Sequence, residues 1–342
     1  MERIIRLQRK IAPELFGTIE IRYRILRHVQ YAGPVGRRAL AGMMGIGERI
    51  VRAQVDHLKF QGLMDFLPQG MVITLEGQSI LDELAEYIRL TRGLASLEAE
   101  LKERLALNQI VIIPGDSDED DSVARELGRA AVAVLNQRLR ENMVVAVSGG
   151  STMANFAEAV TGAMPSVTVV PARGGLGELV EYQANTIAAV VANKLGGRYR
   201  LLHVPDGVSE QALEVFLAQD ANHRAVAEMI RRADILVHGI GGAAEMATRR
   251  ALDDSVVAEI VRRGAIGEAL GQYCTPEGKI VYVTSGVGLR LEDLAGIGVV
   301  IAIAGGRRKA EAIVAVAGAG AQDVLITDES AARAIQTLIN QS

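Results

Sequence analysis

Cysteine, aromatic residues and long apolar segments are scarce in this sequence. The 342 residues include one cysteine, Cys274, which permits no internal disulfide and no cysteine-based metal site and is typical of a reducing cytoplasm. Tryptophan is absent and aromatic residues make up 4% of the chain, which argues against recognition of single-stranded nucleic acid by base stacking. No apolar run approaches the ~18 residues of a membrane helix, so we expect a cytoplasmic protein with no membrane partner.

The charge of the chain is unevenly distributed. Its 37 Lys and Arg residues against 41 Asp and Glu residues give a net charge of −4. Residues 1–75 hold 12 of the basic and 6 of the acidic residues, a net charge of +6, whereas the remaining residues carry −10. A basic head on an acidic body indicates a polyanionic partner at one end of the chain.

Three short helices are predicted near the N-terminus, the last two at about 35–44 and 48–61. A tight turn that contains two glycines joins these two helices. Apolar segments on either side of Pro68-Gln69-Gly70 indicate a small hairpin over 63–74. This order of elements is typical of a winged helix-turn-helix DNA-binding domain, which we assign to residues 1–75.

The helix at 48–61 has the composition of a DNA recognition helix. Its apolar residues Val51, Val55 and Leu58 share one face, and basic side chains occupy the opposite face. Arginine presents two donors that match guanine O6 and N7 in the major groove. The alternative is a protein-contact module whose arginine face is simply solvated. The residues expected to contact DNA are Arg37, Arg38, Gly47, Glu48, Arg49, Arg52, Asp56, Lys59 and Gln69.

A helical pattern continues over residues 76–106. Apolar residues recur every seven positions from Ile80 to Leu101, and Gly93 interrupts the pattern. We expect a linker helix that either pairs with the same helix of a second copy or packs against its own domain.

From residue 107 to 342, short apolar segments alternate with helical ones. The segments are too uniformly apolar to have one solvated face, which is typical of strands in a parallel sheet covered by helices. We therefore expect an α/β domain with a mostly parallel, doubly wound sheet, and a solvated acidic loop at Asp116–Asp121. The expected strands are Gln109–Ile113, Met143–Val147, Val167–Val170, Tyr199–His203, Ile235–His238, Ile280–Thr284, Val299–Ile303 and Val324–Ile326.

Glycine-rich loops follow four of these strands. In Val147–Met153, glycines and hydroxyls precede a helix, an arrangement that cradles phosphate with backbone N–H groups, hydroxyls and the helix dipole. The loop has neither a Walker A lysine nor GxGxxG spacing, so we expect no nucleotide cofactor. We also expect no metal site. Arg173 offers a planar fork for phosphate, and Glu268 lies among glycines as an acceptor for sugar hydroxyls.

Together these loops predict a site for an anionic, phosphorylated ligand. The alternative is a glycine-rich α/β fold whose cations pair with surface carboxylates. The residues expected to bind the ligand are Gly149, Gly150, Ser151, Thr152, Arg173, Gly174, Gly175, Gln183, Arg249, Arg250, Glu268 and Lys309.

Several motifs of the chain resemble the SorC family of bacterial sugar-responsive regulators. They are the winged helix-turn-helix and the segments VSGGSTM, PARGGLGE, QANTIAA, LVHGIGGA, GAIGEALG and IAIAGGRRKAEAI. The resemblance covers nearly the whole chain and implies an effector domain with the fold of sugar-phosphate isomerases and deaminases, in a homotetramer built as a dimer of dimers. PARGGLGE and QANTIAA are most similar to the glycolytic branch of the family, for which the implied inducer is fructose-1,6-bisphosphate.

The resemblance also implies residue roles. One phosphate of the inducer would contact Gly150, Ser151 and Thr152, with Arg249 or Arg250 and Lys309 completing its site. The other phosphate would contact Arg173, Gly174, Gly175 and Gln183, and Glu268 would accept sugar hydroxyls. The third helix departs from the family pattern, because Gly47 stands where Ser or Thr commonly precedes the Glu-Arg pair.

Two functions from different classes fit these features. The first is a repressor of a glycolytic operon, which binds double-stranded operator DNA and is released by a phosphorylated sugar. The second is a sugar-phosphate isomerase or deaminase with an appended DNA-binding head, which requires a general base near the sugar carbons. Glu268 is the one obvious candidate base, and no histidine lies in the phosphate loops, so we expect a regulator and not an enzyme. A protein-interaction adaptor is a third possibility, for which the basic head gives little support.

Overall fold

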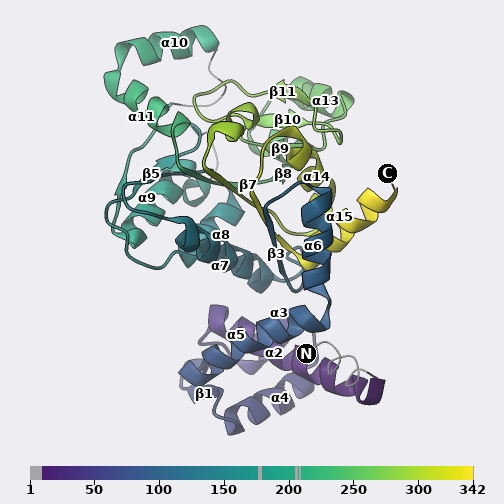
Figure 1. Ribbon diagram of the computed structural model, residues 1–342. Coiled ribbons are helices and arrows are strands. Elements are labelled where there is room, and N and C mark those ends of the chain that lie inside the picture. Colours follow the sequence, from purple (N-terminus) through teal and green to yellow (C-terminus); the bar gives the residue numbers. More distant parts are fainter. Residues whose placement is uncertain (1–9, 176–178, 205–206, 208, 342) are drawn as a thin grey trace. The chain divides into compact units, whose positions relative to one another are not determined.

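The computed structural model describes residues 10–175, 179–204, 207 and 209–341, which divide into two compact units (Figure 1). The first unit extends to Leu97 and includes Asp120–Ser122, and the second contains Glu98–Glu119 and the chain from Val123 onward. Residues 176–178, the end of the PARGGLGE segment, lie outside the described residues. None of the described helices is long and apolar enough to cross a membrane.

A winged helix-turn-helix forms the first unit. Its elements are α2 (Pro13–Ala32), α3 (Arg37–Met44), α4 (Glu48–Phe60), the antiparallel strands β1 (Met64–Leu67) and β2 (Gly70–Ile73), and α5 (Leu75–Thr91). Ile25 of α2, Leu40 of α3 and Val51 of α4 are fully buried in one hydrophobic core. Gly45 takes a left-handed conformation with φ of 65° after α3, which permits the tight turn into α4.

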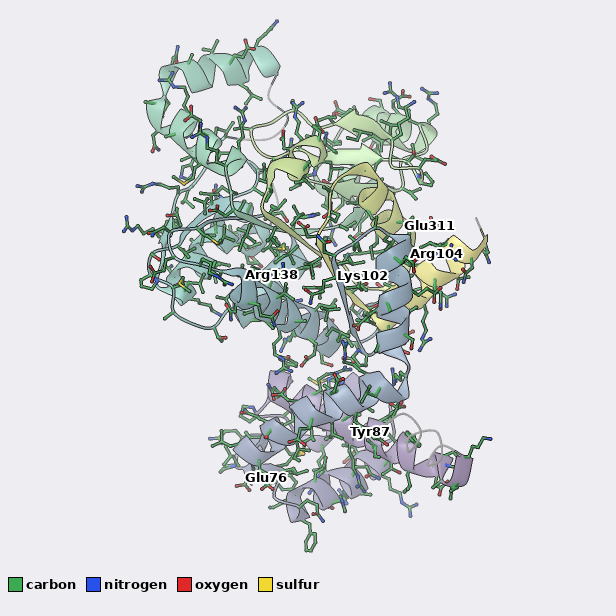
Figure 2. All side chains as sticks on the ribbon, viewed as in Figure 1. Glu76, Tyr87, Lys102, Arg104, Arg138 and Glu311 are labelled. Atoms are coloured by element: carbon green, nitrogen blue, oxygen red, sulfur yellow. The ribbon has the colours of Figure 1, made fainter. Side chains whose placement is uncertain are left out.

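The segment expected to be one linker helix forms two helices, α5 and α6 (Leu94–Arg104). Gly93 separates them with a left-handed φ of 67°, a conformation that glycine adopts without strain. The helix α5 packs on α2, and its Leu81 enters the core of the first unit. Tyr87 of α5 stacks on Phe16 of α2 with 6.2 Å between ring centroids (Figure 2). The compact first unit therefore extends beyond the expected boundary at residue 75.

Seven parallel strands form the central sheet of the second unit. They are β3 (Gln109–Ile113), β4 (Val144–Val147), β5 (Thr168–Pro171), β6 (Arg198–Tyr199), β7 (Ile235–Gly239), β12 (Val299–Ile303) and β13 (Val324–Asp328). All five residues of β13 are buried, so helices cover both faces of the sheet there. The strand order is β3-β13-β12-β7-β4-β5-β6, so the direction of winding reverses between β4 and β7.

Helices connect the strands of this sheet, as the alternating sequence pattern predicts. They are α7 (Asp121–Arg138), α8 (Ser151–Ala159), α9 (Ala184–Leu195), α10 (Glu210–Gln219), α11 (Ala221–Arg231), α12 (Ala243–Arg249), α13 (Asp254–Arg262), α14 (Ala310–Ala319) and α15 (Glu329–Gln341), with the 3-10 turns η1 (Val180–Tyr182), η2 (Leu291–Gly296) and η3 (Arg307–Lys309). Arg104 at the end of α6 donates from Nη2 to Oδ1 of Asn340 in α15 at 2.8 Å (Figure 2).

A second, four-stranded antiparallel sheet was not anticipated. It has the order β11-β10-β9-β8, from β8 (Gly241–Gly242), β9 (Gly267–Ala269), β10 (Gln272–Cys274) and β11 (Ile280–Val283). The expectation that Ile280–Thr284 joins the parallel sheet is therefore wrong, because a short turn returns the chain antiparallel to β10. The strand expected at Tyr199–His203 is also shorter, and β6 ends at Tyr199.

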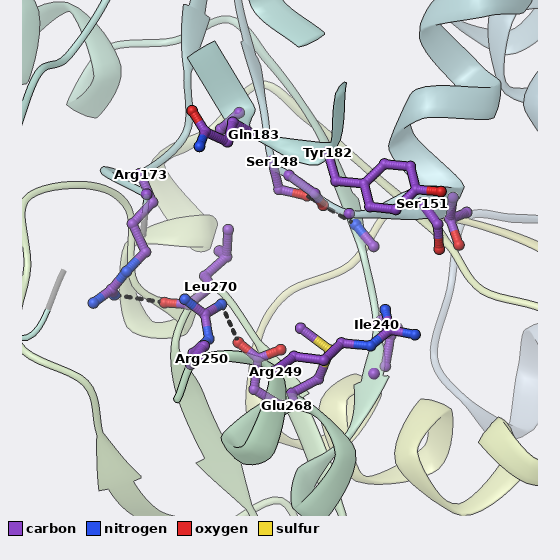
Figure 3. Close-up of a pocket in the computed structure, with 18 of the residues that line it drawn as sticks. Ser148, Ser151, Arg173, Tyr182, Gln183, Ile240, Arg249, Arg250, Glu268 and Leu270 are labelled. Atoms are coloured by element: carbon purple, nitrogen blue, oxygen red, sulfur yellow. Dashed lines mark hydrogen bonds and ion pairs between the residues drawn. The ribbon is translucent and has the colours of Figure 1, made fainter. Parts of the chain in front are cut away.

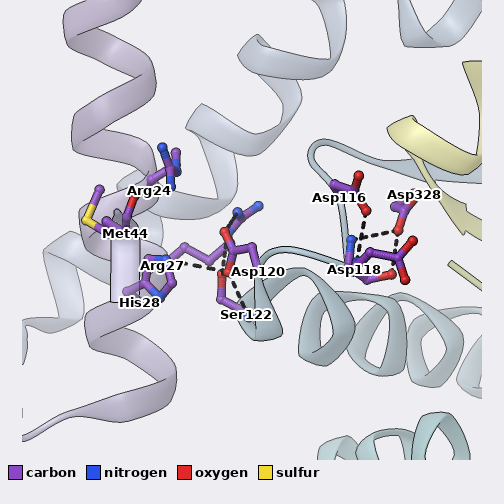
Figure 4. Close-up of polar contacts among 10 residues, drawn as sticks. Arg24, Arg27, His28, Met44, Asp116, Asp118, Asp120, Ser122 and Asp328 are labelled. Carbon is purple, nitrogen blue, oxygen red and sulfur yellow. Dashed lines mark hydrogen bonds and ion pairs between the residues drawn. The ribbon is translucent and has the colours of Figure 1, made fainter. Parts of the chain in front are cut away.

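The acidic segment Asp116–Asp121 is largely a solvent-exposed loop, as its composition predicts, but two of its carboxylates also form specific contacts (Figure 4). In the second unit, Oδ1 of Asp118 accepts a hydrogen bond of 2.9 Å from Arg308. In the first unit, Oδ2 of Asp120 accepts one of 2.8 Å from the buried Arg27. Burial raises the pKa of Asp120, but hydrogen bonds from His28 and Ser122 and the charge of Arg27 outweigh it and hold this pKa well below its usual range.

Candidate effector pocket and DNA-binding surface

A pocket opens at the C-terminal ends of β4 and β7, where the winding of the parallel sheet reverses (Figure 3). Doubly wound sheets bind their ligands at this kind of position. All twelve residues that the sequence predicts as ligand contacts line the pocket, although they come from segments far apart in the chain. The fold therefore brings residues of loops that follow separate strands together at one pocket.

The glycine loop after β4 leads directly into α8. Gly150 has a φ of 112°, and the helix begins at Ser151 without a side-chain cap. The N–H of Gly150 donates to the carbonyl of Tyr182 at 2.8 Å, and a side chain at Gly149 would come within 2.7 Å of the same carbonyl. The groups of this loop that an anion can use are thus the N-terminus of α8 and the hydroxyls of Ser151 and Thr152.

Arg173 is buried in the wall of the pocket, and backbone carbonyls hold its guanidinium. Its Nη1 donates to the carbonyl of Leu270 at 2.7 Å, and its Nη2 donates to the carbonyl of Thr284. These two carbonyl acceptors orient the guanidinium fork. Figure 3 shows Arg173 and Ser151 on opposite sides of the pocket. The pocket therefore presents anion-binding groups at two separated places.

Arg250 and Glu268 form an ion pair in the pocket. Oε1 of Glu268 accepts a hydrogen bond of 2.9 Å from Nη2 of Arg250 and one of 2.6 Å from the N–H of Gly271. Glu268 is 3% exposed, so the pair lies in an environment of low dielectric where the two charges compensate strongly. Glu268 therefore partly neutralises Arg250, so Arg250 attracts a bound phosphate less strongly than an unpaired arginine would.

Arg249 and Lys309 supply the remaining positive charge. Nη2 of Arg249 lies 2.8 Å from Oε1 of Glu245, one helical turn earlier on α12. Burial lowers the pKa of Lys309 below its usual value, and the nearby carboxylate of Glu245 acts in the opposite direction. Cationic side chains outnumber acidic ones in the lining, which suits an anionic ligand. The charged residues of the lining are Arg173, Arg249, Arg250, Lys309, Glu245 and Glu268.

The lining also contains residues that the sequence analysis did not single out. Glu245 precedes Arg249 by four positions, and this spacing is the signal by which it could have been placed on the same helix face. Ile240, Met246 and Leu270 carried no signal, because apolar residues are frequent throughout the chain. The remaining ones are Ser148, Tyr182, Ala184, Gly239 and Gly241.

His238 at the end of β7 does not line the pocket. It is fully buried, with Nε2 2.8 Å from Oε1 of Gln322 and Nδ1 3.0 Å from the carbonyl of Gly239. Burial lowers its pKa, which keeps the imidazole neutral, as is typical of a structural histidine. Within the described ranges, no group of three His, Cys, Asp or Glu side chains is placed to hold a metal ion.

The helix α4 presents its basic face to solvent. Val51, Val55 and Leu58 are buried, whereas Arg49 and Arg52 on the opposite side are exposed. The helix begins after Gly47 without a side-chain cap, so its first N–H groups are accessible to a phosphate. Eight of the nine predicted DNA contacts are exposed, and the ninth, Arg37, is partly buried.

Arg37 and Asp56, both predicted to contact DNA, contact one another. Nη2 of Arg37 lies 2.8 Å from Oδ1 of Asp56, and both side chains retain solvent exposure. Such exposed ion pairs contribute ~0–1 kcal/mol, so a DNA phosphate can compete for the arginine. The sequence did not indicate this pairing, because the two residues lie on different helices.

Comparison with known proteins identifies the family. Residues 91–337 match the sugar-binding domain family, and residues 18–88 match the CggR N-terminal DNA-binding domain family. The central glycolytic genes regulator of Priestia megaterium is 42% identical over 336 residues, which cover 97% of this chain and 98% of that protein. The regulator of the same name from Bacillus subtilis is 41% identical over 335 residues, with the same coverage. A solved SorC family transcriptional regulator from Enterococcus faecalis matches with a TM-score of 0.66 and 39% identity, over 70% of this chain and 99% of that one. The chain belongs to the SorC family.

A full-length SorC structure supports the same architecture. The sorbitol operon regulator SorC from Klebsiella pneumoniae matches 94% of this chain and 98% of its own with a TM-score of 0.65, and at 16% identity it shows the fold alone. SorC-family relatives and solved neighbours are named as transcriptional regulators and not as enzymes, in agreement with the sequence prediction. The chain is therefore a sugar-responsive, DNA-binding repressor.

Proposed function

We propose that this repressor controls a glycolytic operon and that fructose-1,6-bisphosphate relieves the repression. The observation that carries this proposal is the positively charged pocket with anion-binding groups on two opposite sides, at the point where the sheet changes its direction of winding. A ligand with one phosphate would satisfy one of these sides, whereas a bisphosphate satisfies both. The names of the relatives from Priestia megaterium and Bacillus subtilis support a role in glycolysis.

One phosphate would bind at the N-terminus of α8. There the uncapped N–H groups, the hydroxyls of Ser151 and Thr152, and the helix dipole all favour an anion. Arg249 and Lys309 would add positive charge, with Arg250 held by Glu268, and Gly149 and Gly150 would allow close approach of the phosphate.

The second phosphate would bind across the pocket. Arg173 would supply the charge there, and the backbone at Gly174 and Gly175 and the amide of Gln183 would add hydrogen bonds. The carboxylate of Glu268 would accept hydrogen bonds from the hydroxyls of the sugar between the phosphates.

Operator binding would rest on α4. Arg49 and Arg52 would read base edges in the major groove, and Arg38, Lys59 and the N-terminus of α4 at Gly47 and Glu48 would contact phosphates. Gln69 at the tip of the hairpin would reach the neighbouring groove or backbone. We propose that the protein acts in the cytoplasm as a dimer of dimers, so that two-fold related heads meet half-sites spaced by turns of DNA.

Relief of repression would be a shift in population. An inducer weakens operator binding to the extent that it binds more tightly to the conformation with low operator affinity. No chemical step is required of the pocket, and turnover of a sugar phosphate by the purified protein would contradict this view.

A gel shift on the DNA upstream of the protein's own gene tests the proposal. We expect a complex that fructose-1,6-bisphosphate dissociates at lower concentration than fructose-6-phosphate, glucosamine-6-phosphate or inorganic phosphate. A complex that persists in the bisphosphate and dissociates in a monophosphate would refute the choice of inducer. Absence of any specific complex would refute the proposed operator.

A further inference from the structure

Phe66 in the wing lies beneath Arg37 and Lys59, two of the cations that the sequence predicts to contact DNA. Cζ of Arg37 lies 4.9 Å from the centroid of the Phe66 ring, and Nζ of Lys59 lies 4.3 Å from it. Both distances are within the ~6 Å over which a cation is attracted to the negative face of an aromatic ring. The ring of β1 thus contacts one residue of α3 and one of α4.

Asp56 completes this cluster. Its carboxylate pairs with Arg37 at 2.8 Å and partly compensates the charge of this arginine. The repulsion between Arg37 and Lys59 is thereby reduced, so both cations can lie near the same ring. Nε of Arg37 is shielded from solvent and has no hydrogen-bond partner among the described residues, so that nitrogen does not fix the guanidinium. The ring and the carboxylate are the groups that hold it.

A fixed cation binds DNA differently from a mobile one. Lysine and arginine side chains lose much rotamer freedom when they bind, and this entropy opposes binding. A ring that restrains Arg37 and Lys59 before DNA arrives reduces that loss and sets their spacing. The reduction applies to a DNA geometry that matches the fixed spacing, whereas non-specific binding depends on charge alone.

We propose that Phe66 is a positioning residue for operator recognition. By cation–π contact it holds the side chains of Arg37 of α3 and Lys59 of α4 at a fixed spacing. This inference rests on the proposed contact of α4 with the operator. It adds that an uncharged residue, Phe66, contributes to that contact. Phe66 need not contact DNA, because it acts through the two cations.

The test changes the electrostatics of the ring at nearly constant shape. Full-length protein is made with a trifluorinated phenylalanine at position 66, which weakens the negative ring face, and with Phe66→Tyr, which keeps it. Binding is measured by fluorescence anisotropy on the DNA upstream of the protein's own gene and on a scrambled duplex of equal length. We expect the fluorinated protein to lose about fivefold in operator affinity, Phe66→Tyr to bind as wild type, and neither to change on scrambled DNA.

A double-mutant cycle separates positioning from a structural role. Lys59→Gln should weaken operator binding less in a Phe66→Leu background than in the wild type, because the lysine is no longer held. Phe16→Leu is the matched control, since its ring stacks on Tyr87 in the same unit, and it should leave the effect of Lys59→Gln unchanged. Unchanged operator affinity in the fluorinated protein, equal losses on both duplexes, or strictly additive effects in the cycle would overturn the inference.

Arg52→Ala distinguishes this inference from the proposed function. If Arg52→Ala retains operator binding, the proposed contact of α4 fails and the role of Phe66 fails with it. If Arg52→Ala loses operator binding and the fluorinated protein does not, the inference about Phe66 alone is wrong.

Discussion

Nη2 of Arg249 lies 2.8 Å from Oε1 of Glu245 in the wall of the effector pocket. Arg249, one of the cations that we propose for inducer binding, is therefore already paired with the carboxylate of Glu245. A phosphate that binds there must compete with Glu245 or remain outside its reach.

Glu245→Gln is expected to strengthen inducer binding about two- to fivefold. An exposed ion pair contributes roughly 0.2–1 kcal/mol, which a bound phosphate must replace. Isothermal titration calorimetry with fructose-1,6-bisphosphate measures the change. Glu259→Gln, which unpairs Arg262 and Arg263 outside the pocket, is the control and should bind as wild type. Weaker binding by Glu245→Gln would mean that the carboxylate assists the ligand.

Arg52→Ala is expected to reduce operator affinity by about 10- to 100-fold and to leave inducer binding unchanged. A bidentate contact of arginine with guanine contributes roughly 1–3 kcal/mol of discrimination. Fluorescence anisotropy measures DNA binding, and calorimetry measures inducer binding. Arg262→Ala, an exposed arginine of the effector unit, is the control for loss of charge. Parallel losses of both activities in Arg52→Ala would contradict two separable modules.

Thr152→Ala is expected to give a repressor that binds DNA but needs about 10- to 100-fold more inducer for release. Its hydroxyl would donate to a charged phosphate, and hydrogen bonds to charged groups contribute roughly 1.5–3 kcal/mol when one partner is removed. The inducer concentration for half-release of the operator is the readout. The exposed Thr161→Ala serves as control. Release of Thr152→Ala at the wild-type concentration would show that the phosphate binds elsewhere.

The raised pKa of the buried Cys274 thiol predicts that the folded protein loses stability at high pH. Burial raises the pKa of its thiol from 9.0 to about 11. The unfolded chain therefore releases this proton at lower pH than the folded chain, so the stabilising contribution is complete below pH 9 and declines as the pH rises to 11. This shift in pKa corresponds to about 3 kcal/mol of folding stability that is lost over this interval. Urea unfolding should show a shallower decline for Cys274→Ala, and identical slopes would contradict the assignment.

Much of the effector site was predictable because glycine, hydroxyl and cationic residues recur immediately after apolar strands. Parallel strands end at one edge of the sheet, so loops as distant as those of Ser151 and Lys309 were expected to meet. The pairing of Glu245 with Arg249 could also be read from their four-residue spacing on one helix. What the sequence could not provide is the pairing of Arg250 with Glu268, because Glu268 lies in a second sheet for which the sequence carried no clear pattern.

In the DNA-binding unit, too, some features could be predicted from the sequence and others could not. Helical periodicity in α4 predicted which residues are buried and which basic side chains are exposed. The contacts of Phe66 with Arg37 and Lys59 join three elements and leave no periodic trace in the sequence. Asp120 is similar, since its pairing with Arg27 joins residues that lie 93 positions apart, and an acidic run gives no sign of a buried partner.

The measurement that tests the central claim most directly is the affinity of fructose-1,6-bisphosphate for the protein with and without saturating operator DNA. Coupling between two sites is reciprocal, so an inducer that weakens operator binding by some factor must itself bind more weakly, by the same factor, to the operator complex. We expect calorimetry to find this loss of inducer affinity with the upstream DNA and no such loss with a scrambled duplex. Equal affinity of the bisphosphate for the free and the operator-bound protein would contradict this expectation.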